Sequence, residues 1–158
     1  MSTPHHDVIV IGSGFSGLGM GIFLKKAGRD DFLILEKSTD FGGTWLDNDY
    51  PGAACDVPSH MYSYSFEQNP EWSRFYSGQA EILAYMKKCA KKYDLYPHFR
   101  GNSELIEARW SDAKKQWALK TAGGQQFAAR VVESGIGGLS RPAIPSVKGR
   151  EHLQGTVF

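Results

Sequence analysis

The chain has 158 residues, and its 18 basic and 17 acidic side chains give a formal net charge of +1. This length suits one domain with a single core and leaves no room for a second full domain. The balanced charge gives no electrostatic argument for nucleic acid, a membrane surface or a polyanionic partner. Cys55 and Cys89 form neither a C-x-x-C pair nor a disulfide framework, which favours a reducing, cytoplasmic location.

The first residues lack the pattern of a targeting segment. No charged region is followed by a long apolar core, so we expect neither a signal peptide nor a membrane span. His5 and His6 are expected to belong to a disordered leader and not to a metal site. We predict no metal site elsewhere in the chain.

A strand–helix–strand unit is predicted from Asp7 to Glu36. Val8 to Ile11 is an unbroken apolar run, which is typical of a parallel strand that is buried on both faces. Gly12, Gly14 and Gly17 follow as G-x-G-x-x-G. In this motif the first glycine allows a tight turn, the second lets a pyrophosphate approach the backbone, and the third lets the helix pack closely on the strand.

The rest of this unit fits an adenine dinucleotide site. A helix is predicted from Phe15 to about Ala27, followed by Gly28 at its C-terminal end. The free N–H groups at its N-terminus and its dipole favour a diphosphate. Phe32 to Leu35 is the second strand, and Glu36 follows Gly17 by 19 residues (36 − 17), the spacing of an acid that binds ribose hydroxyls and repels a 2′-phosphate. The apolar helix positions are Phe15, Leu18, Ile22 and Phe23.

Residues 37–56 form a long loop that is rich in glycine and aromatic residues. Loops of this length are usually either disordered or functional, and this composition is too apolar for disorder. Paired glycines allow the backbone to lie flat against a planar ligand, and Trp45 offers an aromatic surface beside the Thr44 hydroxyl.

The pattern Gly42-Gly43-x-Trp45-x-x-x-x-Tyr50-Pro51-Gly52-x-x-x-Asp56 resembles the fingerprint of the Baeyer–Villiger monooxygenases, a branch of the class B flavoprotein monooxygenases. The resemblance continues through residues 58–63 and 70–73. It implies the N-terminal FAD-binding segment of an enzyme that uses FAD, NADPH and O2. In such an enzyme a C4a-peroxyflavin converts a small-molecule ketone to an ester or lactone.

The resemblance also implies roles for individual residues. Gly12, Gly14 and Gly17 would hold the FAD pyrophosphate, and Glu36 the adenosine ribose. Asp56 would be catalytic, because the family places this aspartate near an arginine that acts beside the flavin. The backbone of Leu105 would lie near the adenine. The full set of implied cofactor-binding residues is Gly12, Gly14, Phe15, Ser16, Gly17, Glu36, Lys37, Gly43, Thr44, Trp45, Asp56, Tyr62, Leu105 and Gly135.

The second half of the chain predicts one helix and an antiparallel β-meander. Residues 79–93 form an amphipathic helix whose Lys87, Lys88, Lys91 and Lys92 are expected to solubilise its outer face. Three strands follow at residues 103–110, 116–121 and 126–133, separated by turn sequences. The last leads into a return strand at residues 130–135. The fold class is therefore α/β, a Rossmann-like parallel sheet with a β-meander crossover.

Glu133 departs from the family pattern, because a buried parallel strand should carry an apolar residue there. Residues 137–142 resemble the segment where the family leaves the FAD domain for the NADPH domain. The second family fingerprint, F-x-G-x-x-x-H-x-x-x-W, would begin at Leu153, and its histidine would follow Phe158. Residues 1–158 are thus expected to be the first part of an FAD domain, without the NADPH domain and the later half of the FAD domain.

Two alternatives stay open at this point. The chain could come from a flavin-containing monooxygenase that oxidises nitrogen or sulfur, although the full match from Gly42 to Asp56 argues against it. It could also be a dinucleotide-binding module without turnover. The substrate, self-association and association with further segments are not determined by the sequence.

Overall fold

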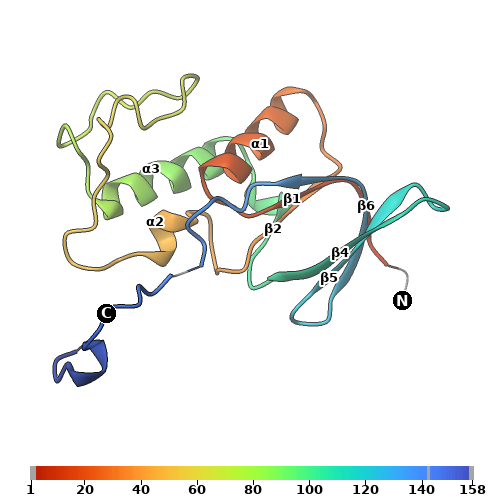
Figure 1. Ribbon diagram of the computed structural model, residues 1–158. Helices are drawn as coiled ribbons and strands as arrows, with labels where there is room; N and C mark the ends of the chain where they lie inside the picture. Colours follow the sequence, from red (N-terminus) through yellow and green to blue (C-terminus); the bar gives the residue numbers. More distant parts are fainter. Residues whose placement is uncertain (1–2, 142, 157–158) are drawn as a thin grey trace.

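The computed structural model describes residues 3–141 and 143–156, so Pro142 and Phe158 of the segments above lie outside the described residues. One six-stranded sheet in the order β3-β2-β1-β6-β5-β4 organises the chain (Figure 1). The strands are β1 (His5–Ile11), β2 (Phe32–Leu35), β3 (Phe99–Arg100), β4 (Leu105–Ser111), β5 (Gln116–Thr121) and β6 (Gln126–Ser134). The α-helices are α1 (Phe15–Lys26), α2 (Thr44–Asp47) and α3 (Gln79–Lys92), and two short 3-10 helices are η1 (Tyr96–His98) and η2 (Arg150–His152).

Four parallel strands form one half of the sheet. β1 pairs in parallel with β2 on one side and β6 on the other, and β2 pairs in parallel with β3. All four residues of β2 are buried, as expected for a strand covered on both faces. The predicted α/β class with a Rossmann-like parallel sheet is confirmed.

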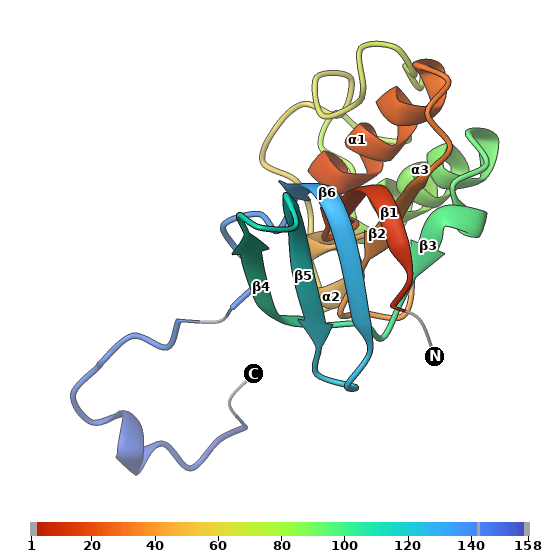
Figure 2. The same cartoon turned by 90° about the vertical axis from the view of Figure 1, so that its right-hand side faces the viewer.

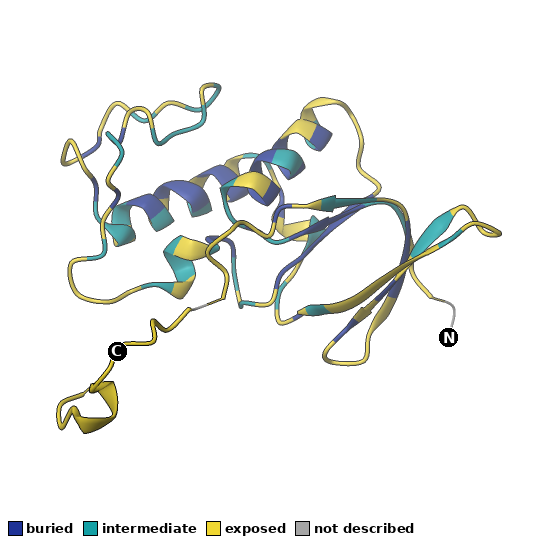
Figure 3. Cartoon of the chain, in the orientation of Figure 1, coloured by how far each residue is buried: buried dark blue, intermediate teal, exposed yellow. Residues whose placement is uncertain are grey.

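Helices α1 and α3 cover one face of this sheet (Figures 1 and 3). Their buried side chains pack in one cluster with alternate residues of β1 and β2, which point to the same face. The central members of this cluster are Val10, Leu18, Ile22, Ile34, Ile82, Met86 and Cys89. Both cysteines are buried and free, in keeping with the absence of a predicted disulfide.

The antiparallel meander covers part of the opposite face. β4 pairs with β5 and β5 with β6, both antiparallel, and β6 continues as the strand beside β1 (Figure 2). Leu119 of β5 shares a buried cluster with Leu33 and Leu35 of β2, although two strands separate them in the sheet order. The sheet therefore bends, so that its antiparallel half closes over the parallel half. The predicted third meander strand and return strand are one strand, β6.

One expectation about the N-terminal unit was wrong. His5 and His6 are not a disordered leader, because they extend β1 and pair with Ala128 and Ala129 of β6. This pairing depends on a strand far away in the sequence, so local composition could not show it. Among the apolar positions of α1, Phe23 is 57% exposed and meets Phe66 edge to face.

The lysines of α3 act as predicted for a solvated helix face. Lys87 forms an ion pair with Asp40, and Lys92 forms one with Glu67. Residues 136–141 and 143–156 are exposed throughout, and residues 143–156 run away from the sheet (Figures 2 and 3). Within the described residues, none of the helices has the length and apolar character needed to cross a bilayer.

Glu133 lies in β6 beside Val10 of β1. One of its carboxylate oxygens is buried without a hydrogen-bond partner among the described residues. Desolvation by burial raises the pKa of this carboxyl group. The prediction that Glu133 places an unpaired, desolvated acid in the parallel sheet is thus confirmed, and its charged form should destabilise the fold.

Replacing Glu133 by valine should raise the free energy of unfolding at neutral pH by about 1 kcal/mol, because it removes the desolvated oxygen. The pKa of Glu133 is higher in the folded than in the unfolded chain. The native protein therefore loses stability as the pH rises from the Glu133 pKa of the unfolded chain to above the Glu133 pKa of the folded chain. The gain in unfolding free energy from valine should be smallest in acid and should reach its full size above the raised pKa. Urea unfolding midpoints of both proteins, recorded across a range of pH, measure it.

The matched control is Glu133→Gln, which removes the charge and keeps the shape. It should recover part of the gain, and that part should depend on pH as the valine gain does, because both variants remove the same titrating group. A valine variant that is no more stable than the native chain at neutral pH would show that Glu133 is solvated or paired, and would contradict this placement.

Candidate functional site

A cavity of about 480 Å³ lies at the C-terminal ends of β1, β2 and β6. This is the edge of a parallel sheet where ligands of α/β proteins bind, and the volume is in the range of small-molecule sites. Five segments of the chain meet there. They are residues 11–16, 35–37, 42–47, 103–105 and 135–141, and Tyr62 completes the wall.

The glycine-rich turn brings β1, α1 and β6 into close backbone contact. Gly12 has a φ of +93°, and a Cβ there would lie 2.7 Å from the carbonyl oxygen of Gly135. A Cβ on Gly17 would lie 1.8 Å from the carbonyl oxygen of Gly12. The tight turn and the close helix packing predicted for Gly12 and Gly17 are therefore present, and both contacts exclude any side chain.

Helix α1 begins at the cavity with free donors. Gly14 is its N-cap, and within the described chain no side chain caps it and no acidic residue lies in its first turn. The 12-residue helix thus directs unsatisfied N–H groups and its positive dipole end toward the cavity. This donor set suits a diphosphate.

Glu36 is buried at the end of β2 and holds the turn in place. One carboxylate oxygen accepts hydrogen bonds from the backbone N–H of Ser13 at 2.7 Å and from the Ser13 hydroxyl at 2.8 Å. The other accepts the backbone N–H of Ser38 at 2.9 Å. A carboxylate has about four acceptor positions, so one position stays available for a ligand hydroxyl.

The paired glycines of the long loop press against the turn. Gly42 donates its N–H to the carbonyl of Ser13 at 3.2 Å. Gly43 has φ +52° and ψ −125°, a conformation that strongly favours glycine, and a Cβ there would lie 2.7 Å from the Cα of Gly14. Glycine at both positions therefore brings the two loops into contact at one end of the cavity.

Trp45 and Tyr62 form an aromatic wall beside this contact. The indole N–H of Trp45 donates to the Tyr62 hydroxyl oxygen at 3.0 Å, and the rings meet edge to face. Burial is the main cause that raises the pKa of Tyr62, so its hydroxyl stays protonated at neutral pH and can donate to a ligand.

The structure brings together most of the residues that the resemblance implied. All of them line the cavity except Gly17 and Asp56. Gly17 does not line it because its backbone is packed against Gly12, and Asp56 is exposed outside the lining. Sequence reasoning missed Ser13, Ser38 and Asp47, whose roles depend on contacts between segments, and no local signal marks them.

Lys37 lines the cavity, but its ammonium group is engaged with protein atoms. Its Nζ lies 3.0 Å from a carboxylate oxygen of Asp47 and donates to the carbonyl of Ser140 at 3.3 Å. Lys37 therefore joins the end of β2 to α2 and to the segment that follows β6.

Comparisons with known proteins agree with this geometry. A family model described as an NAD(P)-binding Rossmann-like domain matches residues 10–78. A Baeyer-Villiger monooxygenase of Pseudomonas aeruginosa is 51% identical over 154 residues, which are 98% of this chain and 29% of that protein. The chain thus spans less than a third of the length of this relative.

Solved structures show the same likeness. The closed crystal structure of cyclohexanone monooxygenase has a TM-score of 0.87 and 32% identity, over 95% of this chain and 29% of that one. OTEMO in complex with FAD and NADP has a TM-score of 0.83 and 31% identity, over the same shares of both chains. The resemblance to Baeyer–Villiger monooxygenases that the Gly42–Asp56 pattern predicted is confirmed.

Substituting Gly43 by alanine tests the contact between the two loops. The new methyl group would meet the backbone of Gly14 in a conformation that alanine avoids, so we expect a loss of about 2 kcal/mol or more in unfolding free energy. Gly28→Ala is the control, since Gly28 has φ +69° and open space around it, and it should cost only about 1 kcal/mol. Thermal unfolding of the two variants measures these losses. Equal losses of unfolding free energy for Gly43→Ala and Gly28→Ala would contradict the close approach of Gly14 and Gly43.

Proposed function

We propose that this chain is the FAD-binding segment of an NADPH- and O2-dependent flavoprotein monooxygenase of the Baeyer–Villiger type. The cavity carries the proposal, because a helix N-terminus with free donors, a buried carboxylate and a glycine-rich aromatic loop meet there. Similarity to Baeyer-Villiger and cyclohexanone monooxygenases over nearly the whole chain supports it. In this proposal residues 1–158 are the first part of the FAD domain.

Each wall of the cavity would bind a different part of FAD. The N–H groups at the start of α1 would bind the diphosphate, which the glycine at position 14 lets approach the backbone. The free acceptor position of Glu36 would take an adenosine ribose hydroxyl. The backbone of Leu105, which lines the same cavity, would lie near the adenine.

The loop that follows the paired glycines would hold the flavin end. Gly43 and Thr44 offer backbone and hydroxyl groups, and the hydrogen bond from Trp45 to Tyr62 fixes the orientation of both rings. This aromatic wall excludes water from one side of the ligand. FAD, when bound, supplies the redox and oxygen-transfer chemistry.

Asp56 stays our candidate for a catalytic residue. Its side chain is exposed, but it lies close enough to Tyr62 for its charge to add to the effect of burial on the Tyr62 pKa. A carboxylate at this place would influence charge that develops beside the aromatic wall.

We place the binding sites for NADPH and the ketone mainly outside these residues. The chain corresponds to 29% of the Pseudomonas aeruginosa relative, and in this proposal the described cavity is assigned to FAD. A ketone substrate and an ester or lactone product are proposed from the names of the similar proteins, among them cyclohexanone monooxygenase.

Substitutions of Gly14 test FAD binding without disturbing the fold. Gly14 has φ −66°, and a Cβ there would meet only the Cα of Gly43 at 3.8 Å, so alanine should leave the unfolding temperature unchanged. The methyl group would nevertheless hinder the diphosphate, and we expect affinity for FAD and for ADP to fall roughly tenfold, about 1.4 kcal/mol. Titration followed by flavin fluorescence measures the affinity for FAD, and competition by ADP measures the affinity for ADP.

Gly14→Asp should lower the affinity for FAD and for ADP more than Gly14→Ala does, because it places a negative charge against the diphosphate. Gly124→Ala, in the turn between β5 and β6 and away from the cavity lining, is a control that should bind FAD as the native chain does. A Gly14→Asp variant that binds FAD as well as the native chain would overturn the proposed site.

A further inference from the structure

Helix α2 carries Thr44 and Trp45 into the cavity, yet it has little stability of its own. It consists of four residues, none of which is buried, and no side chain of residues 3–141 or 143–156 caps its N-terminus. A single helical turn is not stable in isolation, so contacts with other segments must hold it in place. The contacts made by Asp47, its last residue, reach two other walls of the cavity.

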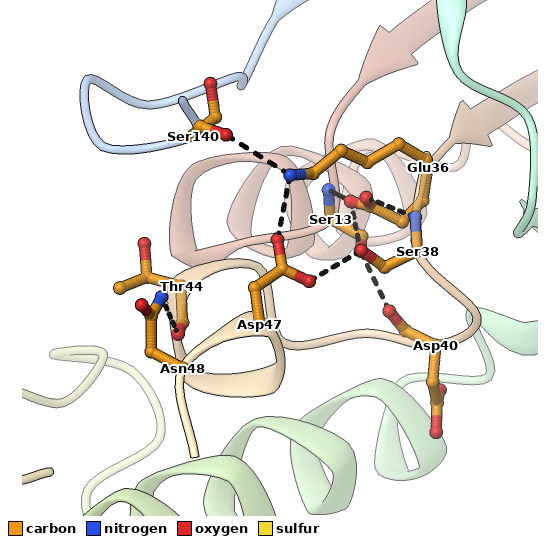
Figure 4. A network of polar contacts seen from close by, with 9 residues as sticks. Ser13, Glu36, Ser38, Asp40, Thr44, Asp47, Asn48 and Ser140 are labelled. Atoms are coloured by element: carbon orange, nitrogen blue, oxygen red, sulfur yellow. Dashed lines mark hydrogen bonds and ion pairs between the residues drawn. The ribbon is translucent and has the colours of Figure 1, made fainter. Parts of the chain in front are cut away.

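Both carboxylate oxygens of Asp47 are used (Figure 4). One accepts the hydroxyl hydrogen of Ser38 at 2.6 Å, and the other lies 3.0 Å from the ammonium of Lys37. The Asp47 and Lys37 side chains are 29% and 41% exposed, so water and salt screen this pair only in part. Asp47 thus fastens the end of α2 to the two residues that directly follow Glu36.

From Ser38 the contacts continue to the glycine-rich turn. The backbone N–H of Ser38 donates to Glu36, whose other oxygen accepts the two Ser13 donors. Ser13 is fully buried, and Glu36 is 4% exposed. The position of α2 is therefore connected, through short hydrogen bonds, to the turn that faces the diphosphate site.

A second branch reaches the segment that follows β6. Lys37 donates to the carbonyl of Ser140, which is 103 residues away in sequence. Residues 136–141 are exposed, and five of them line the cavity: Ile136, Gly137, Leu139, Ser140 and Arg141. Asp47 holds the Lys37 ammonium at the place from which it makes this contact.

We propose that Asp47 is a positioning residue of the cofactor cavity, which fixes the distance between α2, the glycine-rich turn and residues 136–141 before the ligand binds. The inference rests on the proposed FAD site. Preorganisation of this kind raises affinity because fewer groups must be ordered on binding. It should matter most for a ligand that spans the cavity from the turn to α2.

The test compares FAD with ADP, which lacks the flavin end. Asp47→Ala removes both contacts and should weaken FAD binding roughly tenfold, about 1.4 kcal/mol, while ADP affinity changes less than about twofold. Asp47→Asn keeps an acceptor for Ser38 and loses the ion pair, so its FAD affinity should fall between those of alanine and the native residue. The difference between Asp47→Asn and the native chain should shrink at high salt.

The control is Asp49→Asn, which removes a nearby exposed aspartate that does not line the cavity and should leave FAD binding unchanged. Lys37→Met removes the ion pair and also the contact with Ser140, so it should lower FAD affinity at least as much as Asp47→Asn. The double variant should be no worse than Lys37→Met alone, because both changes remove the same pair. Unfolding midpoints are measured for every variant.

The results separate this inference from the proposed function. If the native chain is folded and binds neither FAD nor ADP, both are overturned. If it binds FAD and the Asp47 variants bind FAD equally well, only the positioning role fails. Equal losses of FAD and ADP affinity together with a lower unfolding midpoint would show a general structural role, and would also overturn it.

Discussion

The close backbone contact between Gly12, Gly17 and Gly135 is the constraint on which the rest of the site depends. With any side chain at Gly17, the start of α1 would have to move away from the end of β1. With a side chain at Gly12, the turn would be strained and would separate from β6. These contacts direct the free donors of α1 into the cavity, where an anionic ligand can meet them.

Polar contacts then define the remaining walls. Glu36 satisfies two donors of Ser13 and one of Ser38, so a buried charge is compensated by three hydrogen bonds and stabilises the turn next to it. The same residues lead to Asp47 and α2. These four residues therefore form one connected set of hydrogen bonds beside the N-terminus of α1, whose free donors suit a diphosphate.

The sequence predicted the parts of the fold that local patterns determine. The apolar runs of β1 and β2, the helical spacing of α1 and α3, and the turns of the meander all appear at or near the predicted residues. It failed where long-range pairing decides. β3 has only two residues and forms by pairing with Ile34 and Leu35, and His5 and His6 become a strand only because β6 lies beside them.

The candidate site shows the same division. Gly12, Gly14 and Glu36 are readable because the motif fixes their spacing, and the resemblance added the residues of the aromatic loop. Ser38 and Asp47 could not be found in this way, because a serine and an aspartate in a loop have many roles and their contact forms only in the folded chain. Glu133 could be found because an acidic residue departs from the apolar pattern of a buried strand. One of its carboxylate oxygens is buried without a hydrogen-bond partner among the described residues, which is the physical cost of that departure.

The most direct test of the proposed site is to observe where FAD binds. Backbone amide chemical shifts of the isotopically labelled chain, recorded by nuclear magnetic resonance during titration with FAD, report on each wall separately. We predict saturable shifts that are largest for the amides of residues 12–16 and 43–45, with smaller changes at residues 135–141 that line the same cavity. Shifts confined to other faces of the sheet, or none at saturating FAD in the folded chain, would contradict the proposed site.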